Sequence, residues 1–188
     1  GTVWNTTLSE GVQPIATRTF CEPRLEPEVV FSLRATPPAN ASLQDLFECV
    51  DWVAPGFEVV QSHCPGWKFT APDTVADGGL HGHLRVGPKV PVQNLGNNAQ
   101  DVAQHLANAK VRLLKNGELV EQGQGANVLD SPVHALHHFM QTLRACPGAP
   151  DLQAGDVITT VVTPFKATPL NVAFRFTVVP DRKSTRLN

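Results

Sequence analysis

Two glutamates separated by one residue are the first feature of this sequence that could do chemistry. Glu26 and Glu28 flank Pro27, and on an extended backbone residues i and i+2 point to the same face. Two carboxylates held this close repel each other, so they persist best around a bound cation or in open solvent. Pro27 stiffens the segment and would hold their separation. The pattern alone fits either a cation site or the solvated start of a strand.

A third carboxylate interrupts an apolar stretch. Glu58 lies between Phe57 and Val59, so it must be paired, bound to a metal, or on the exposed face of a strand. If Glu58 converges with Glu26 and Glu28, the three carboxylates would form a hard oxygen site. Such a site suits Mg²⁺ or Mn²⁺ and does not suit zinc.

The following segment offers candidate proton-transfer groups. Lys68 is flanked by Trp67 and Phe69, and a lysine held near apolar groups can exchange protons. The alternative is a surface lysine whose stem covers the rings. Asp77 precedes two glycines, where the backbone can approach a ligand closely, although aspartate is also a common turn residue.

The histidines and glycines do not indicate other familiar sites. His81 and His83 are separated by one glycine, and the third histidine nearby is His63, which makes a histidine metal site improbable. His134 and His138 have zinc-peptidase spacing but lack the glutamate that this motif needs. The sequence also has no phosphate-binding glycine loop and no nucleophile elbow.

The composition restricts the class of protein. The 188 residues include 41% hydrophobic and 17% charged residues with a net charge of -2, which argues against disorder and against a basic nucleic-acid binder. No apolar run is long enough to predict a membrane span. The four widely spaced cysteines form no C-x-x-C pair, so we expect a reduced, cytoplasmic protein.

Short elements separated by turns must position these residues. We expect a hairpin over residues 110–123 around Asn116-Gly117, because this dipeptide favours a type I′ turn. Ser42 is expected to cap a helix that runs to about Trp52, where Pro55-Gly56 follows as a break, and Ser131 to cap a second helix. Many strands with two helices predict an α+β fold that is mostly β. The expected strands are 29–35, 57–61, 84–86, 90–92, 157–162 and 172–178.

Taken in order, these segments resemble the fumarylacetoacetate hydrolase superfamily. The likeness is to its branch of 2-keto-4-pentenoate hydratases and 4-oxalocrotonate decarboxylases, and it covers about residues 1–160. The E-x-E strand corresponds to residues 23–31, the strand of the third acidic ligand to 56–60, and the D-x-x-A-D segment to 73–77. The other matching segments are residues 115–118 with 123–126, 132–136 and 152–160.

The resemblance implies a fold and a metal site. The fold would be a mixed β-roll or β-sandwich of the C-terminal-domain type with a few flanking helices. Glu26, Glu28 and Glu58 would hold Mg²⁺ or Mn²⁺. The substrate would be a 2-oxo or 2-hydroxydienoic acid from aromatic catabolism, and the metal would stabilise an enolate that serves hydration or decarboxylation.

The resemblance also suggests roles around that metal. Lys68 and Asp77 are the expected catalytic acid and base, while His81 and Thr160 are expected to bind substrate. The protein would act on a small 2-keto acid, would form a homo-oligomer, and would have no nucleic-acid or membrane partner. The alternatives are a C–C hydrolase of the acylpyruvate type and a non-catalytic subunit that binds a small acid.

The sequence departs from the family at both ends. The branch carries a G-x-K-x-G-x-T segment upstream of the part represented here, and residues 161–180 match poorly. Residues 181–188 resemble a translated sequencing adapter. We therefore expect an N-terminally truncated catalytic domain over residues 1–180 and a non-native tail over residues 181–188.

Overall fold

The computed structural model describes residues 2–162, 168–169 and 176–178. Its strands are β1 (Leu8–Glu10), β2 (Arg24–Leu33), β3 (Val50–Val60), β4 (His81–Val86), β5 (Val90–Pro91), β6 (Lys110–Lys115), β7 (Glu118–Gln124), β8 (Val157–Val161), β9 (Thr168–Pro169) and β10 (Phe176–Val178). The α-helices are α1 (Leu43–Cys49), α2 (Ala71–Ala76), α3 (Ala99–Asn108) and α4 (Pro132–Ala145). Short 3₁₀ turns cover residues 5–7, 17–19, 65–67, 78–80, 92–94 and 125–127.

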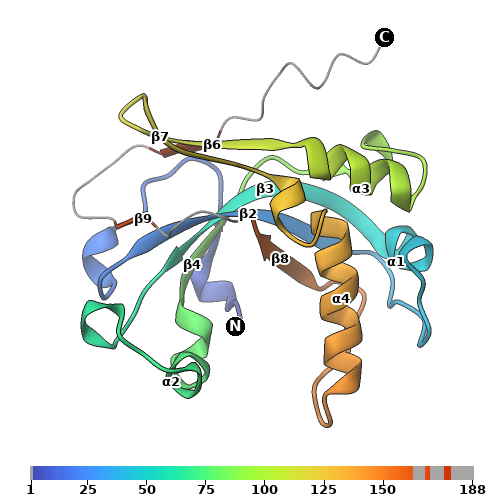
Figure 1. The fold of residues 1–188 in the computed structure, drawn as a ribbon, viewed down its shortest axis with the longest axis horizontal. Helices are drawn as coiled ribbons and strands as arrows, with labels where there is room; N and C mark the ends of the chain where they lie inside the picture. The colour runs from blue at the N-terminus through green and yellow to red at the C-terminus, as the bar shows by residue number, and fades with distance from the viewer. Residues whose placement is uncertain (1, 163–167, 170–175, 179–188) are drawn as a thin grey trace.

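A seven-stranded mixed sheet forms the centre of the molecule (Figure 1). Its strand order is β1-β4-β3-β2-β8, with β5 beside β3 and β9 beside β2. β1 runs parallel to β4, and the other neighbours are antiparallel. A separate three-stranded sheet has the order β10-β6-β7, and its β6-β7 hairpin confirms the turn expected at Asn116-Gly117.

The two faces of the central sheet pack differently. Val29 and Phe31 of β2 join the main apolar core with α1, α3 and α4, which cover this face in Figure 1. Val30 points the other way and packs against Ala54, Leu84 and the residues around them. Because side chains alternate along a strand, the even-numbered residues of β2, Glu26 and Glu28 among them, lie on the face away from the three helices.

The helix expected from Ser42 to Trp52 is shorter than predicted. Its N-cap is confirmed, since the Ser42 hydroxyl accepts the Asp45 backbone N–H at 3.2 Å, but α1 ends at Cys49 and β3 starts at once. Pro55 lies inside β3, where β4 pairing has ended and β5 pairing has not begun. A proline there removes no ladder hydrogen bond, and the Pro55 carbonyl accepts from Gly87 at 2.8 Å.

The structure holds more helix than the sequence predicted. α2 and α3 were not expected, although α3 has a clear signal: the Asn98 side chain caps it, and Val102 and Leu106 face the core four residues apart. The second predicted helix is confirmed as α4, capped by Ser131. Of the strand predicted over residues 172–178, the described part is β10, and the remainder lies outside the described residues.

Among the described residues, no helix has both the length and the apolar character needed to cross a membrane.

Candidate metal centre

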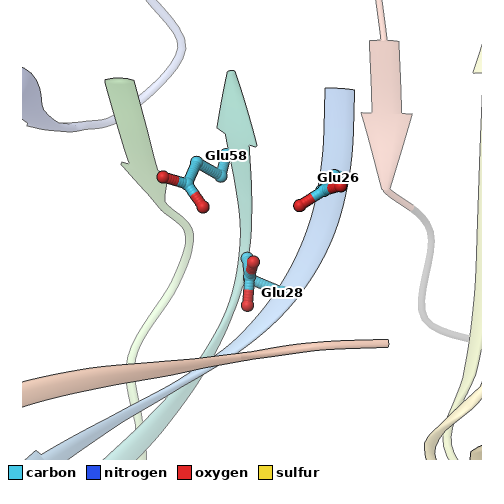
Figure 2. A group of neighbouring side chains, drawn as sticks. All are labelled: Glu26, Glu28 and Glu58. Carbon is cyan, nitrogen blue, oxygen red and sulfur yellow. The ribbon is translucent and has the colours of Figure 1, made fainter. Parts of the chain in front are cut away.

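Strand register brings the three glutamates together. Glu26 on β2 lies directly opposite Glu58 on β3, and Glu28 is the next residue of β2 on the same face. Each side chain offers one carboxylate oxygen, and these oxygens all lie within 4.8 Å of one another (Figure 2). The structure therefore assembles the three-carboxylate cluster that the sequence suggested.

Glu28 is the most buried member of this cluster. Glu28 is 2% exposed, and neither of its carboxylate oxygens has a hydrogen bond of normal geometry among the described residues. Burial raises the pKa of Glu28 well above its ordinary value, and the negative charges of Glu58 and Glu26 raise it further. The nearby Thr159 hydroxyl opposes this shift. A buried carboxylate without a partner is costly, and a bound cation would remove that cost.

The pKa of Glu26 is also raised, though less than that of Glu28. Burial and the charge of Glu58 raise its pKa, whereas the charge of Arg24 lowers it. The donor set of three carboxylates is hard and anionic, which fits a divalent cation that prefers oxygen ligands. On both grounds, the residues present fit a Mg²⁺ or Mn²⁺ site.

His81 holds the third glutamate in place. Its ring Nδ1 contacts the Glu58 carboxylate, and its Nε2 lies 2.7 Å from the Thr7 hydroxyl. Because a carboxylate can only accept, Nδ1 carries a proton and donates it to Glu58. The His81 side chain is 5% exposed. We expected His81 at the substrate, and the structure places it behind a candidate ligand, where it orients the Glu58 carboxylate.

Gly56 leaves room beside Glu28. It is the residue of β3 directly opposite Glu28, and a Cβ atom there would lie 2.7 Å from a methyl carbon of Val30 and 2.9 Å from the backbone oxygen of Arg85. No side chain larger than hydrogen fits without moving these strands. The dipeptide that was expected to break a helix therefore helps to shape the cluster.

The two residues expected to act as acid and base make no direct contact with the cluster within the described part of the chain. Asp77 binds the His63 ring Nδ1 at 2.5 Å and its backbone N–H at 3.2 Å. These bonds hold the pKa of Asp77 below its usual range, although burial acts in the opposite direction. Lys68 is exposed and follows Trp67 at the end of a short 3₁₀ turn.

Thr160 and Thr159 lie on opposite faces of β8. Thr160 pairs with Val29, which faces the helices, whereas Thr159 pairs with Val30 and shares the face of the glutamates. The structure thus brings Thr159, and not the expected Thr160, toward Glu28. Alternation along β8 predicts that Thr159 and Thr160 face opposite sides of the sheet. Which of them faces the glutamates depends on how β8 pairs with β2, and the sequence alone does not specify that pairing.

Arg24 is a further residue of this face that the sequence analysis missed. It precedes Glu26 by two positions on β2 and lies opposite Val60. The period-2 rule applied to the E-x-E pattern would have found it, because Arg24, Glu26 and Glu28 occupy alternate positions of one strand.

The class of protein follows from comparison with known families. Residues 3–164 match the family described as fumarylacetoacetate (FAA) hydrolase, C-terminal, so the chain belongs to that family. This confirms the resemblance inferred from the E-x-E strand and the segments that follow it.

The curated relatives that the chain matches carry hydratase and decarboxylase names. The chain is 32% identical over 138 residues to 2-hydroxyhexa-2,4-dienoate hydratase from Comamonas testosteroni, which covers 73% of this chain and 48% of the relative. It is 30% identical over 121 residues to 4-oxalocrotonate decarboxylase from Pseudomonas sp, which covers 62% of this chain and 42% of the relative. The chain spans about half the length of the curated relatives it matches.

Solved structures share the fold. One is 4-oxalocrotonate decarboxylase from Pseudomonas putida G7 complexed with magnesium and adipate, at a TM-score of 0.61 and 22% identity, covering 84% of this chain and 57% of that one. Another is maleylpyruvate hydrolase from Sphingobium sp. SYK-6 in complex with manganese (II) ion and pyruvate, at a TM-score of 0.61 and 20% identity, covering 93% of this chain and 57% of that one.

Proposed function

We propose that the protein is a divalent-metal-dependent lyase, a hydratase or decarboxylase of 2-oxo or 2-hydroxydienoic acids. The observation that carries this proposal is the buried, unpartnered carboxylate of Glu28 within 4.8 Å of the ligand oxygens of Glu26 and Glu58. Relatives with hydratase and decarboxylase names support the reaction class. Fold neighbours complexed with magnesium, calcium and manganese support a divalent ion.

The three glutamates would hold the ion, and His81 would keep Glu58 turned toward it through the Nδ1 hydrogen bond. A divalent cation bound there supplies Lewis acidity, which polarises a 2-oxo group and stabilises the negative charge of an enolate. The glutamates must all be ionised to do this, so they bind the ion best once protons have left Glu28 and Glu26.

Proton transfer needs a second group beside the substrate, and Lys68 and Asp77 remain the proposed pair. Asp77 is ionised and fixed by His63, so it can orient a proton carrier. Lys68 is exposed and lies one residue from Trp67, which borders Arg24. His81 and Thr160 stay proposals as substrate contacts, and Thr159 is the better placed of the two neighbouring threonines.

The experiment that tests this function measures exchange of the C3 protons of a 2-oxo acid with deuterated water by NMR in the full-length protein. We expect exchange that requires Mg²⁺, stops with a chelator and is lost in Glu58→Gln. An exposed glutamate variant, Glu118→Gln, should behave as wild type. Absence of exchange with Mg²⁺ present would contradict an enolate-forming enzyme and favour a subunit that only binds small acids.

Product analysis on active preparations then separates the reactions. Release of carbon dioxide indicates decarboxylation, addition of water to a dienoate indicates hydration, and cleavage to two acids indicates a C–C hydrolase of the acylpyruvate type. We also propose a homo-oligomer in the cytoplasm with the β-roll arrangement of the family. Exposed Leu119 and Val120 on edge strand β7 support association, and light scattering of the purified protein tests it.

A further inference from the structure

One cation lies on the same face of the sheet as the three glutamates. Arg24 occupies the position of β2 two residues before Glu26 and points to the same side. Its side chain is half-buried. The guanidinium carbon lies 3.9 Å from the centroid of the Trp67 ring, in a cation–π contact.

Trp67 is itself anchored, so the arginine is held in a defined place. The indole N–H of Trp67 donates to the Glu22 backbone oxygen at 3.0 Å, and the Gly66 backbone N–H donates to the Glu22 carboxylate at 3.0 Å. These bonds tie the turn after β3 to the segment that leads into β2. The ring that supports Arg24 is therefore fixed by the segments that adjoin the two strands carrying the glutamates.

Among the described residues, the guanidinium of Arg24 makes no hydrogen bond and no ion pair, and its contact is the Trp67 ring. Arginine carries five donors in a planar fork that matches a carboxylate. Stacking on an aromatic face uses the plane of the guanidinium and leaves its edge free for an anion. The site thus combines three carboxylates that attract a cation with one preoriented cation that attracts an anion.

We propose that Arg24 binds a second carboxylate of the substrate, so that this site prefers 2-oxo acids with a carboxylate at the far end over matched monocarboxylic acids. This inference rests on the proposed function, because it needs the first carboxylate and the 2-oxo group at the glutamate cluster. Arg24 would then act as a specificity residue at the far end of the substrate.

The experiment compares two stable probes of equal chain length, 2-oxoadipate and 2-oxohexanoate, which differ only in the terminal carboxylate. Their affinities are measured by calorimetry on the full-length protein with Mg²⁺, for wild type, Arg24→Gln, Arg24→Lys and the exposed control Arg112→Gln. We expect wild type to bind the diacid about ten- to a hundredfold more tightly, the range of a charge-assisted hydrogen bond.

Arg24→Gln should lose this preference, which is read from the ratio of the two affinities, because loss of the Arg24 charge also raises the pKa of Glu26 and so weakens both probes alike. Arg24→Lys should keep a smaller preference, because lysine retains the charge without the planar fork, and Arg112→Gln should match wild type. Equal affinities for the two probes in wild type, or a preference that persists in Arg24→Gln, would overturn the proposal. Loss of Mg²⁺-dependent binding of both probes in wild type would instead contradict the proposed function.

A purely structural role of Arg24 gives a different result. If Arg24 only supports Trp67, Arg24→Gln would lower the thermal midpoint and weaken both probes equally. Thermal unfolding of each variant is therefore measured beside the calorimetry, and equal weakening that leaves the preference for the diacid intact overturns the specificity role.

Discussion

Replacing Glu28 with glutamine should stabilise the metal-free protein and, in the same variant, weaken metal binding. Glutamine has nearly the same volume, so the change removes a charge and leaves the packing in place. The ligand oxygens lie within 4.8 Å of one another, and at that limit two unit charges repel by about 3.5 kcal/mol at an effective dielectric constant of about 20. Glu28 faces two such charges when all three carboxylates are ionised.

Part of this repulsion is avoided without any mutation. Burial and the two neighbouring charges raise the pKa of Glu28, so the metal-free protein holds the Glu28 proton to higher pH than an ordinary glutamate does and thereby reduces the repulsion. The glutamine amide also remains buried without a partner, which costs about 1–3 kcal/mol. The net gain in unfolding free energy of metal-free Glu28→Gln near neutral pH should therefore be about 1–3 kcal/mol, well below the sum of the two Coulomb terms.

The assay is urea unfolding with a chelator and then with a series of Mg²⁺ concentrations. A ligand that binds the folded state stabilises it by about 2.7 kcal/mol at a hundred times its dissociation constant. Wild type should show this gain, and Glu28→Gln should need at least about a hundredfold more Mg²⁺ for it, a loss beyond the 10–100-fold typical of outer-shell changes. Glu118→Gln, on exposed β7, is the matched control.

The reasoning is refuted if Glu28→Gln destabilises the metal-free protein and binds Mg²⁺ as wild type does. That pair of results would identify Glu28 as a structural residue whose charge the fold tolerates.

Three further outcomes follow from the same site. Metal-free wild type should lose stability relative to Glu28→Gln as pH rises above about 4.5, the ordinary pKa of glutamate. The reason is that the folded state holds the Glu28 proton to higher pH than the unfolded chain does. Urea unfolding with a chelator at several pH values measures this, and a stability difference that does not grow with pH would contradict it. His81→Gln should lower Mn²⁺ affinity about 10–100-fold, because Glu58 loses its orienting partner. Calorimetry measures this affinity, and an unchanged value would place His81 outside the metal centre. Gly56→Ala should lower the unfolding free energy by about 1–3 kcal/mol, because the new methyl group overlaps Val30 and the Arg85 backbone. Urea unfolding measures this loss, and an unchanged midpoint would show that the strands move apart at no cost.

Local patterns were sufficient for many elements of the fold. The hairpin at Asn116-Gly117 and the capped helix α4 depend on backbone preferences of a few neighbouring residues, so the sequence predicts them directly. The start of β3 could not be predicted in this way. Residues 50–52 continue the helix expected from Ser42, and they form a strand instead because β2 pairs with Val50 and Trp52.

The sequence by itself determined which carboxylates to follow. Glu26 and Glu28 share a face on any extended strand, and Glu58 stands out as a charge in an apolar segment. By the same alternation, Arg24 shares the face of Glu26 and Glu28, although we did not predict it. These conclusions need no contact between distant parts of the chain.

Only the tertiary structure decided how these residues meet. The antiparallel register places Glu58 opposite Glu26, fixes Gly56 opposite Glu28 and turns Thr159, not Thr160, toward the cluster. The residues that support this cluster are also distant in sequence: the Thr7 hydroxyl contacts the His81 ring although the two residues are 74 positions apart. A one-residue shift in pairing would move each side chain to the other face, and register is set by packing of the whole sheet rather than by the residues of one strand.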